Sequence, residues 1–288
     1  MTNDFLLGGD TPVRRVGLGA MRLVARGHQG PAVPTEDALA TLRSAVELGI
    51  DHLDTADFYR YRTATANQLI RTALRPYPAG LVLATKVGPV ATPAGPPRQG
   101  TAADLVPSVT ANLRSLGVDR LDLVYLRIGG IDGPPDESIE ERFTILARLR
   151  EEGLIRHLGL SNVSAGHLAE ARRIAPVAAV QNRYGWGDTG DDALLAECAA
   201  AGIGYVPFFP LGGGRRPLAD PALRKVARRH GVAVATVALA WLLDRSATVL
   251  AIPGTASPAH LAENVAAAGL ALSDADRAEL GTPATAAR

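Results

Sequence analysis

The sequence predicts an α/β fold, a (β/α)8 or TIM barrel, with an N-terminal β-hairpin and a short C-terminal tail. Eight short runs rich in Val, Ile or Leu alternate with amphipathic segments, as expected for parallel strands that are buried on both faces. Composition does not shift along the chain, so we expect one barrel domain over residues 1–288. A doubly wound open sheet is the structural alternative. Its Gly-x-Gly-x-x-Gly fingerprint, with an acidic residue about 20 positions later, does not follow the first strand.

Local signals delimit the predicted elements. A hairpin is expected at Phe5–Val13, with its turn at Gly8, Gly9 and Asp10. Strands are expected at Val16–Ala20, His52–Thr55, Leu81–Lys86, Leu121–Arg127, His157–Leu160, Ala178–Gln181, Gly204–Phe208 and Val249–Ile252. Helices are expected from a cap at Thr35 to Gly49, from a capping box at Ser138–Glu141 to Gly153, and at Ala103–Leu116, Ala165–Ile174, Asp192–Ala201, Pro221–His230, Val234–Arg245 and Pro258–Ala267.

One long segment, Val87–Gly100, is too rich in Pro and Gly to be helical. It follows the third strand, so in a barrel it overhangs the C-terminal face. Loops on that face build the active site, and this loop is expected to cover substrate.

The composition excludes several classes of protein. Of 288 residues, 47% are hydrophobic and 20% are charged, which is typical of a folded globular chain. The net charge of +1 leaves no excess of positive charge for a phosphate backbone, so no nucleic-acid partner is expected. Cys198 is the only cysteine, which excludes an intrachain disulfide and a cysteine-rich metal site. We expect it to be a small buried residue and expect no bound metal.

Two features predict a cytoplasmic protein with no membrane partner. The N-terminal sequence MTNDFLLGGD lacks the basic flank and apolar core of a signal peptide. The longest nearly apolar run, Val232–Leu243, is too short to span a bilayer. The oligomeric state is left open by the sequence.

Polar residues lie at the ends of three successive predicted strands. Asp54, Lys86 and Arg127 end the second, third and fourth strands, and Tyr59 lies in the loop after the second. A phenol with a pKa near ~10 is a poor acid at neutral pH, but a nearby cation favours its ionised form. Lys86 can provide that cation, Asp54 can orient it, and Tyr59 can then donate a proton to a developing alkoxide. Only Lys86 and Lys225 among the 30 basic residues are lysines. A lysine at position 86 therefore indicates that the bulkier guanidinium of arginine would not serve there.

Each of these residues also has a structural interpretation. Asp54 alone could cap a loop, Tyr59 alone could line an amphipathic wall, and Lys86 alone could be a solvated strand end. Their coincidence around successive strand ends favours the catalytic interpretation.

Seven segments, in order along nearly the whole chain, carry a family resemblance. They are GLGAMR at 17–22, LDTADFY at 53–59, TKVG at 85–88, GLSN at 159–162, VQNRYG at 180–185, PFFPLGG at 207–213 and IPGTASPAHLAEN at 252–264. In these segments the chain resembles the aldo-keto reductase superfamily. The resemblance implies an enzyme that reduces a small carbonyl compound with a nicotinamide cofactor, with Asp54, Tyr59 and Lys86 catalytic and Tyr59 the general acid.

The resemblance also implies an NADPH site. From the nicotinamide to the adenosine end, its residues would be Met21, Asp54, Ser161, Asn162, Gln181, Phe208, Pro210, Leu211, Gly212, Gly213, Gly254, Thr255, His260, Glu263 and Asn264. Ser161, Asn162 and Gln181 would hold the carboxamide, and Phe208 would stack on the nicotinamide ring. The glycines at 212–214 would let the backbone approach the pyrophosphate closely, although such a run may equally form a flexible loop.

The adenosine segment leaves the choice of cofactor partly open. A helix that begins after Pro253 presents N–H groups suited to a phosphate, and Thr255 and His260 could bind a 2′-phosphate. The family often has lysine and arginine where this chain has Gly254 and His260. NADPH is therefore expected, with NADH as the alternative.

Arg127 is the main departure from the family, which usually has histidine at that strand end. None of the six histidines here aligns with that position. Arginine stays protonated and cannot act as a general acid, but its fixed donors can stabilise developing negative charge on a carbonyl oxygen. The alternative is an inactive relative that keeps only the cofactor site.

Arg127, VPFFPLGG and the TADFY stretch look most like the branch that contains bacterial pyridoxal reductases. Pyridoxal or a similar hydroxylated aromatic aldehyde is therefore the expected substrate. Arg60 and Tyr61 depart from that branch, because a glycine usually follows the tyrosine, and the tail after Leu280 is short. The alternatives are a secondary-metabolite tailoring reductase that acts on a larger carbonyl or imine, and a weakly active NADPH-binding regulatory protein.

Overall fold

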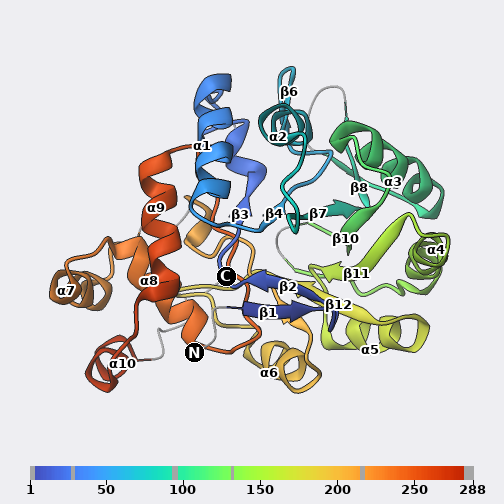
Figure 1. Cartoon of the computed structure of the whole chain (residues 1–288). Coiled ribbons are helices and arrows are strands. Elements are labelled where there is room, and N and C mark those ends of the chain that lie inside the picture. Colours follow the sequence, from blue (N-terminus) through green and yellow to red (C-terminus); the bar gives the residue numbers. More distant parts are fainter. Residues whose placement is uncertain (1–3, 27–29, 93–96, 131–132, 215–217, 282–288) are drawn as a thin grey trace.

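A computed structural model describes residues 4–26, 30–92, 97–130, 133–214 and 218–281 of the chain (Figure 1). Its central sheet consists of β3 (Leu18–Gly19), β4 (His52–Asp54), β7 (Val82–Val87), β10 (Leu121–Arg127), β11 (Ile155–Ser161), β12 (Val177–Gln181) and β13 (Gly204–Tyr205). These strands are parallel and lie in the order β13-β12-β11-β10-β7-β4-β3. All seven overlap the predicted strands.

The eighth predicted strand closes this sheet into a barrel. Val249 forms a parallel bridge to Tyr205, and Ala251 forms one to Val16. Leu250 donates its N–H to the Tyr205 carbonyl at 2.9 Å, which continues the ladder. The segment is a pair of isolated bridges rather than a regular strand, because it makes only one or two hydrogen bonds to each neighbour. The predicted (β/α)8 barrel is confirmed.

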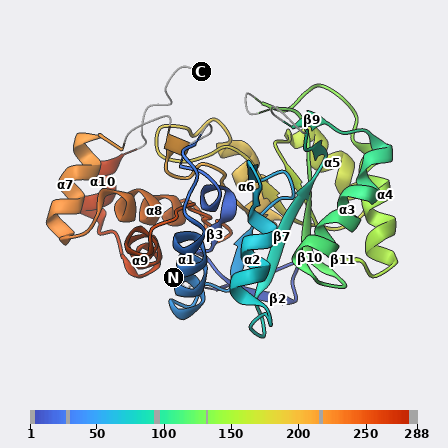
Figure 2. The same ribbon diagram turned by 90° about the horizontal axis from the view of Figure 1, so that it is seen from above.

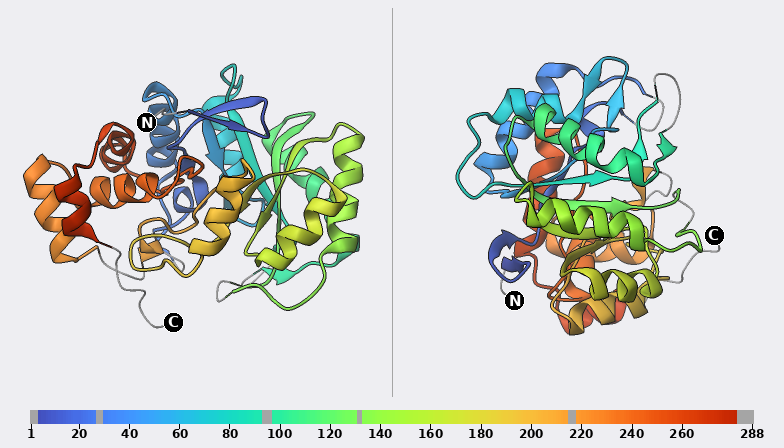
Figure 3. Two further views of the ribbon diagram at one scale, coloured as in Figure 1. Left: turned by 90° about the horizontal axis from the view of Figure 1, so that it is seen from below. Right: turned by 90° about the vertical axis from the view of Figure 1, so that its right-hand side faces the viewer.

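The N-terminal hairpin closes one end of the barrel. Its strands, β1 (Asp4–Leu7) and β2 (Thr11–Arg14), pair antiparallel as predicted. Leu7 and Val13 are buried against apolar side chains of the barrel interior. Figures 2 and 3 place this hairpin at the end opposite the loops that follow the strands. The other end of the barrel is therefore left for ligands.

Helices surround the sheet. They are α1 (Thr35–Glu47), α2 (Ala66–Leu74), α3 (Ala102–Leu116), α4 (Glu140–Glu151), α5 (Ala165–Ile174), α6 (Asp192–Ala200), α7 (Pro221–His230), α8 (Val234–Asp244), α9 (Pro258–Ala266) and α10 (Asp274–Leu280), with 3-10 turns η1 (Ala20–Leu23), η2 (Gly212–Gly214) and η3 (Ala267–Gly269). The sequence did not predict α2 and α10. Both are short, and their caps, Thr65 and Ser273, are recognisable only once the helix is known.

Two predicted helix starts are wrong in detail. Thr35 is the first residue of α1, and its side chain makes no cap hydrogen bond. Ser138 does not form a reciprocal capping box at α4. Instead, the Glu170 carboxylate of α5 accepts hydrogen bonds from Ser138 and from the Glu140 N–H group, so a neighbouring helix caps α4.

The Pro- and Gly-rich segment after β7 has more structure than predicted. Its ends form a small antiparallel pair, β8 (Pro89–Val90) and β9 (Arg98–Gln99). A second pair, β5 (Arg60–Tyr61) and β6 (Ala64–Thr65), lies between β4 and α2. Both pairs lie in loops that follow barrel strands, where the site was expected.

Cys198 is buried in α6, and burial raises the pKa of its thiol to about 12. This agrees with the predicted role as a packed residue, because a thiol with so high a pKa is not a nucleophile at neutral pH. In the described ranges, no single helix has the length and hydropathy to cross a membrane. The pair α7 and α8, bent by 100°, meets that criterion together, by length and composition only.

We predict that Gly159→Ala destabilises the barrel. A Cβ at Gly159 in β11 would lie 2.6 Å from the ring of Tyr125 and 2.9 Å from the carbonyl oxygen of Ala179. Overpacking of this kind costs about 1–3 kcal/mol, because ring and backbone must both shift. Urea denaturation should show a lower midpoint at unchanged slope.

Gly166→Ala is the matched control. Gly166 lies within α5, and the nearest atom to an added Cβ is Ser164 Oγ at 3.5 Å. Alanine should be neutral or stabilising by up to about 1 kcal/mol, through helix propensity. Equal destabilisation by both variants would contradict the packing argument.

Candidate active site

The C-terminal ends of three adjacent strands meet at the barrel mouth. Asp54 is the last residue of β4, Lys86 lies one residue before the end of β7, and Arg127 is the last residue of β10. In the sheet Asp54 is opposite Ala84, and Tyr125 is opposite Lys86. The predicted convergence is therefore observed.

Asp54 and Lys86 form a buried ion pair. Lys86 Nζ lies 2.5 Å from Asp54 Oδ1, and the two side chains are 2% and 4% exposed. The ammonium also donates to the Thr55 carbonyl at 3.1 Å. The second carboxylate oxygen, Oδ2, accepts a hydrogen bond from Gln181 Nε2 at 2.7 Å. Both charges thus have several partners, as buried charges require.

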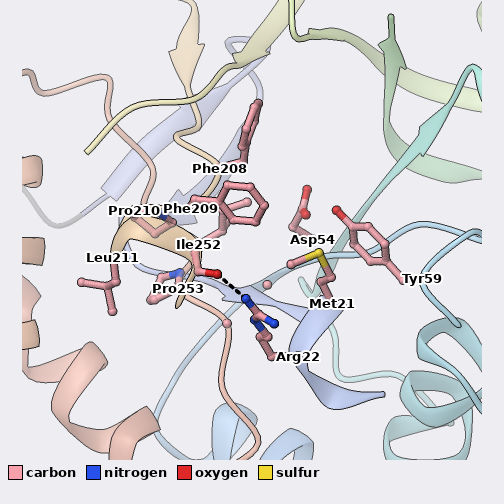
Figure 4. Close-up of a pocket in the computed structure, with 13 residues that line it drawn as sticks. Met21, Arg22, Asp54, Tyr59, Phe208, Phe209, Pro210, Leu211, Ile252 and Pro253 are labelled. Atoms are coloured by element: carbon pink, nitrogen blue, oxygen red, sulfur yellow. Dashed lines mark hydrogen bonds between the residues drawn. The ribbon is translucent and has the colours of Figure 1, made fainter. Parts of the chain in front are cut away.

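Tyr59 lies beside this pair. Lys86 Nζ is 4.9 Å from the centre of the Tyr59 ring. Burial by itself would lower the pKa of the Lys86 ammonium, but the charges of Asp54 and Tyr59, and hydrogen bonds to both, raise it overall. The lysine is therefore held in its charged form next to the phenol. Figure 4 shows the Asp54 carboxylate and the Tyr59 hydroxyl pointing toward each other.

A second tyrosine is close to the lysine but is differently placed. Lys86 Nζ is 5.9 Å from the centre of the Tyr125 ring, which is buried in the barrel interior. Burial and the charge of Asp54 raise the pKa of the Tyr125 phenol well above its ordinary value. Tyr59, by contrast, lines the cavity described below. Of the two phenols, Tyr59 is the one that a ligand can reach.

Arg127 is held in one orientation. Its Nη1 donates to Ser161 Oγ at 3.0 Å, and its Nη2 donates to the Gly130 carbonyl at 3.0 Å. The guanidinium lies over the ring of Phe208, with Cζ 5.0 Å from the ring centre. Burial lowers the pKa of Arg127, while the charges of Tyr59 and Asp54 act to raise it. A guanidinium remains protonated under such a shift.

A buried polar network behind the strand ends was missed by the sequence analysis. Thr55 donates its hydroxyl to Asn67 Oδ1 at 2.7 Å, and Thr85 donates to Asn112 Oδ1 at 2.6 Å. Asn67 Nδ2 also donates to Asn112 Oδ1 at 3.0 Å. All four residues are almost completely buried. Because Thr55 follows Asp54 and Thr85 precedes Lys86, this network anchors both strand ends to α2 and α3.

An inner cavity of about 130 Å³ opens beside the ion pair (Figure 4). The predicted site residues that line it are Met21, Asp54, Tyr59, Phe208, Pro210, Leu211, Gly213 and Gly254. Residues that were not predicted also line it, namely Gly19, Arg22, Phe209, Ile252 and Pro253. Segments from four regions of the chain therefore meet at one cavity.

An outer pocket of about 620 Å³ adjoins this cavity. Its lining residues are Arg22, Ala25, Arg26, Gly254, Thr255, Ala256, Ser257 and His260. The structure thus brings the predicted residues Gly254, Thr255 and His260 together. Arg22 and Arg26 come from the turn after β3 and were not predicted. The signal that could have found them is the lack of lysine or arginine in 254–264.

Several predicted carboxamide contacts are already engaged within the chain. Asn162 Nδ2 donates to the carbonyls of Ile128, Gly130 and Gly133, so this amide holds the loop after β10. Gln181 uses its Nε2 on Asp54, but its Oε1 is buried and has no hydrogen-bond partner among the described residues. Ser161 accepts from Arg127 and keeps its own proton available.

Three further predicted residues lie apart from these openings. Glu263 and Asn264 lie on α9 beyond the residues that line the outer pocket, and Asn264 is buried. Gly212 lies in η2 next to Gly213 but lines neither the cavity nor the pocket. Across the described ranges, no three His, Cys, Asp or Glu side chains are grouped so that they could hold a metal ion.

Comparisons with known proteins assign the family. Residues 15–281 match the family described as "Aldo/keto reductase family". The chain belongs to this family. Pyridoxine 4-dehydrogenase of Escherichia coli is 46% identical over 284 residues, which cover 95% of each protein. An uncharacterized oxidoreductase of Schizosaccharomyces pombe is 37% identical over 92% of this chain and 85% of its own length.

A solved structure supports the same assignment. An aldo/keto reductase of Klebsiella pneumoniae, in complex with NADP and acetate, superposes with a TM-score of 0.79 at 26% identity. The match covers 97% of this chain and 94% of that one. The predicted family, fold and enzyme class, an oxidoreductase of the aldo/keto reductase family, are therefore confirmed.

We predict that Asp57→Asn removes a pH dependence of stability. Asp57 lies between Asp54 and Tyr59 in the sequence. Its Oδ1 is buried and has no hydrogen-bond partner among the residues that the structure describes, and burial raises the pKa of its carboxyl group to about 6. Because the folded-state pKa lies above the unfolded one, the native state loses stability as pH rises from about 4 to about 6. Above pH 6 the variant should be more stable than wild type by on the order of 2–3 kcal/mol.

Urea denaturation of both proteins at acidic and alkaline pH measures this difference. Asp119→Asn, which changes an exposed carboxylate, is the control and should leave the profile as in wild type. A wild-type stability that does not fall across this window would show that Asp57 is better solvated than its position implies.

Proposed function

We propose that this protein is an NADPH-dependent reductase that converts the aldehyde of pyridoxal, or of a similar hydroxylated aromatic, to the alcohol. The observation that carries the proposal is the charged Lys86 held between Asp54 and Tyr59 at a cavity beside Phe208. The Escherichia coli relative named pyridoxine 4-dehydrogenase supports the substrate class. The Klebsiella structure with NADP supports the cofactor.

The residues present fit a nicotinamide nucleotide. Within the described ranges Gln181 Oε1 is a buried acceptor with no partner, so a carboxamide N–H would satisfy it. Ser161 retains a hydroxyl proton to donate to the carboxamide oxygen. A Cβ at Gly254 would lie 3.0 Å from the Gly19 carbonyl oxygen and 3.1 Å from Arg22 Cγ, so only glycine lets these two segments approach so closely beside the cavity.

Bound NADPH would supply the hydride for the carbonyl carbon, and the side chains neutralise the negative charge that develops on the carbonyl oxygen. Tyr59 donates its proton to that oxygen, and the Lys86 ammonium stabilises the phenolate that remains. Asp54 keeps Lys86 in place. The Lys86 ammonium also donates to the Thr55 carbonyl, which fixes its orientation. In the oxidative direction Tyr59 takes the proton back.

Arg127 has a separate role in this proposal. It provides fixed donors next to Phe208, which lines the cavity, and it cannot exchange a proton at working pH. In pyridoxal the ring hydroxyl is adjacent to the aldehyde, so one planar guanidinium can interact with both oxygens. A hydroxylated aromatic aldehyde therefore fits this site better than a simple aldehyde does.

The single-domain organisation over residues 1–288 and a cytoplasmic location remain predictions. So does the expectation that neither nucleic acid nor a membrane takes part.

Tyr59→Phe should bind NADPH with wild-type affinity but lose at least about 100-fold in kcat, because only the transition-state proton donor is removed. Fluorescence titration measures binding, and NADPH oxidation with pyridoxal measures turnover. Tyr125→Phe is the matched control, since its ring is buried below the cavity, and it should keep kcat within a few-fold. A Tyr59→Phe enzyme with wild-type kcat would mean that another group donates the proton.

Arg127→Gln should reduce kcat/KM more for pyridoxal than for pyridine-4-carboxaldehyde, which lacks the ring hydroxyl. A charge-assisted hydrogen bond contributes about 1.5–3 kcal/mol, so the difference should be about tenfold or more. Equal losses would remove the substrate argument and leave the reaction class intact.

Two outcomes with the wild-type protein would favour the alternative functions. Turnover of a bulkier carbonyl or imine with none of pyridoxal would favour the tailoring reductase. No turnover despite tight NADPH binding would favour a regulatory protein.

A further inference from the structure

The turn after β3 places two arginines on the wall of the outer pocket that faces α9. Arg22 belongs to η1, and Arg26 follows it in the chain. Both line the outer pocket with Gly254, Ser257 and His260. Arg22 also lines the inner cavity, so it lies where the two openings join.

The α9 side of the pocket provides little positive charge of its own. Between Gly254 and Asn264 the only ionisable groups are His260 and Glu263. The helix N-terminus is also partly satisfied within the chain. Ser257 Oγ accepts from the His260 N–H at 3.4 Å, and Thr255 Oγ1 accepts from the Ser257 N–H at 3.0 Å. An anion in this pocket needs a cation from elsewhere.

Arg22 has an unused donor. Its Nη2 donates to the Gly213 carbonyl at 2.5 Å, which fixes the guanidinium between two loops (Figure 4). Its Nη1 is buried and has no hydrogen-bond partner in the described part of the chain. A buried, unpaired charged donor is costly, and an oxygen of a phosphate would satisfy it.

Arg26 is more open. Its side chain is 63% exposed, and its ion pair with Asp37 of α1 is long at 3.8 Å. An exposed pair of this length contributes little, so the guanidinium can turn to an anion in the pocket at small cost.

We infer that Arg22 and Arg26 bind the phosphates of the nicotinamide nucleotide: Arg22 the pyrophosphate, at the junction of cavity and pocket, and Arg26 the 2′-phosphate, in the outer pocket. This inference rests on the proposed function. The charge that selects NADPH over NADH is then supplied by the turn after β3 and not by the segment 254–264.

The two arginines should respond differently to substitution. Arg26→Gln should raise the Kd for NADP+ and for 2′,5′-ADP about tenfold or more, and change the Kd for NAD+ less than twofold. Arg22→Gln should raise the Kd values for NADP+ and NAD+ by similar factors, about tenfold, because both carry the pyrophosphate. Isothermal titration calorimetry with these three ligands measures each effect without turnover.

Two controls accompany these variants. Arg43→Gln removes the same charge from the exposed face of α1 and should change no Kd beyond twofold. Arg22→Lys keeps the charge and should restore part of the binding lost in Arg22→Gln, which separates ligand binding from misfolding. Unfolding midpoints of all variants check that the barrel is intact.

Three results would overturn the inference: wild-type protein that binds NAD+ as tightly as NADP+, an unchanged NADP+ to NAD+ ratio in Arg26→Gln, or an Arg22→Gln effect confined to NADP+. Carbonyl reduction with equal use of NADH would remove this inference and leave the proposed reaction standing. Selective NADP+ binding with no carbonyl turnover would contradict the proposed reaction and leave this inference standing.

Discussion

The buried ion pair between Lys86 and Asp54 is the constraint around which this barrel mouth is organised. Two charges that are almost inaccessible to water are stable only when each has several partners, and loss of one partner of such a pair costs about 3–5 kcal/mol. Gln181 and the Thr55 carbonyl supply the remaining hydrogen bonds. Three strands, β4, β7 and β12, must therefore end at the same level for the ion pair to have all its partners.

Hydrogen bonds to neighbouring elements also keep the site rigid. The network through Asn67 and Asn112 holds the residues on either side of the ion pair, and it lies outside the barrel where α2 and α3 pack. Arg127 is fixed from the other side by Ser161 and the Gly130 carbonyl. Catalytic groups held by packed neighbours need little reorganisation when charge develops.

The positive charge that an anion needs can come from any element that lines its pocket. The segment 254–264 has a glycine, a helix N-terminus and His260, but no lysine or arginine. Arg22 and Arg26 approach the same space from the turn after β3. For a small anion the position of the cation matters more than the element that carries it, because Coulomb attraction is set by the two charges, their separation and the local dielectric.

The sequence by itself determined the barrel, its order of strands and the convergence of Asp54, Lys86 and Arg127, because hydrophobic period and strand order fix which ends meet. It did not reveal α2, α10, the cap that Glu170 gives to α4, or the arginines of the outer pocket. The two helices are too short to give a clear sequence signal, whereas the cap from Glu170 and the placement of the arginines depend on contacts between segments far apart in the chain. Only the tertiary structure decides which side chain reaches which partner, and so which donors stay free for a ligand.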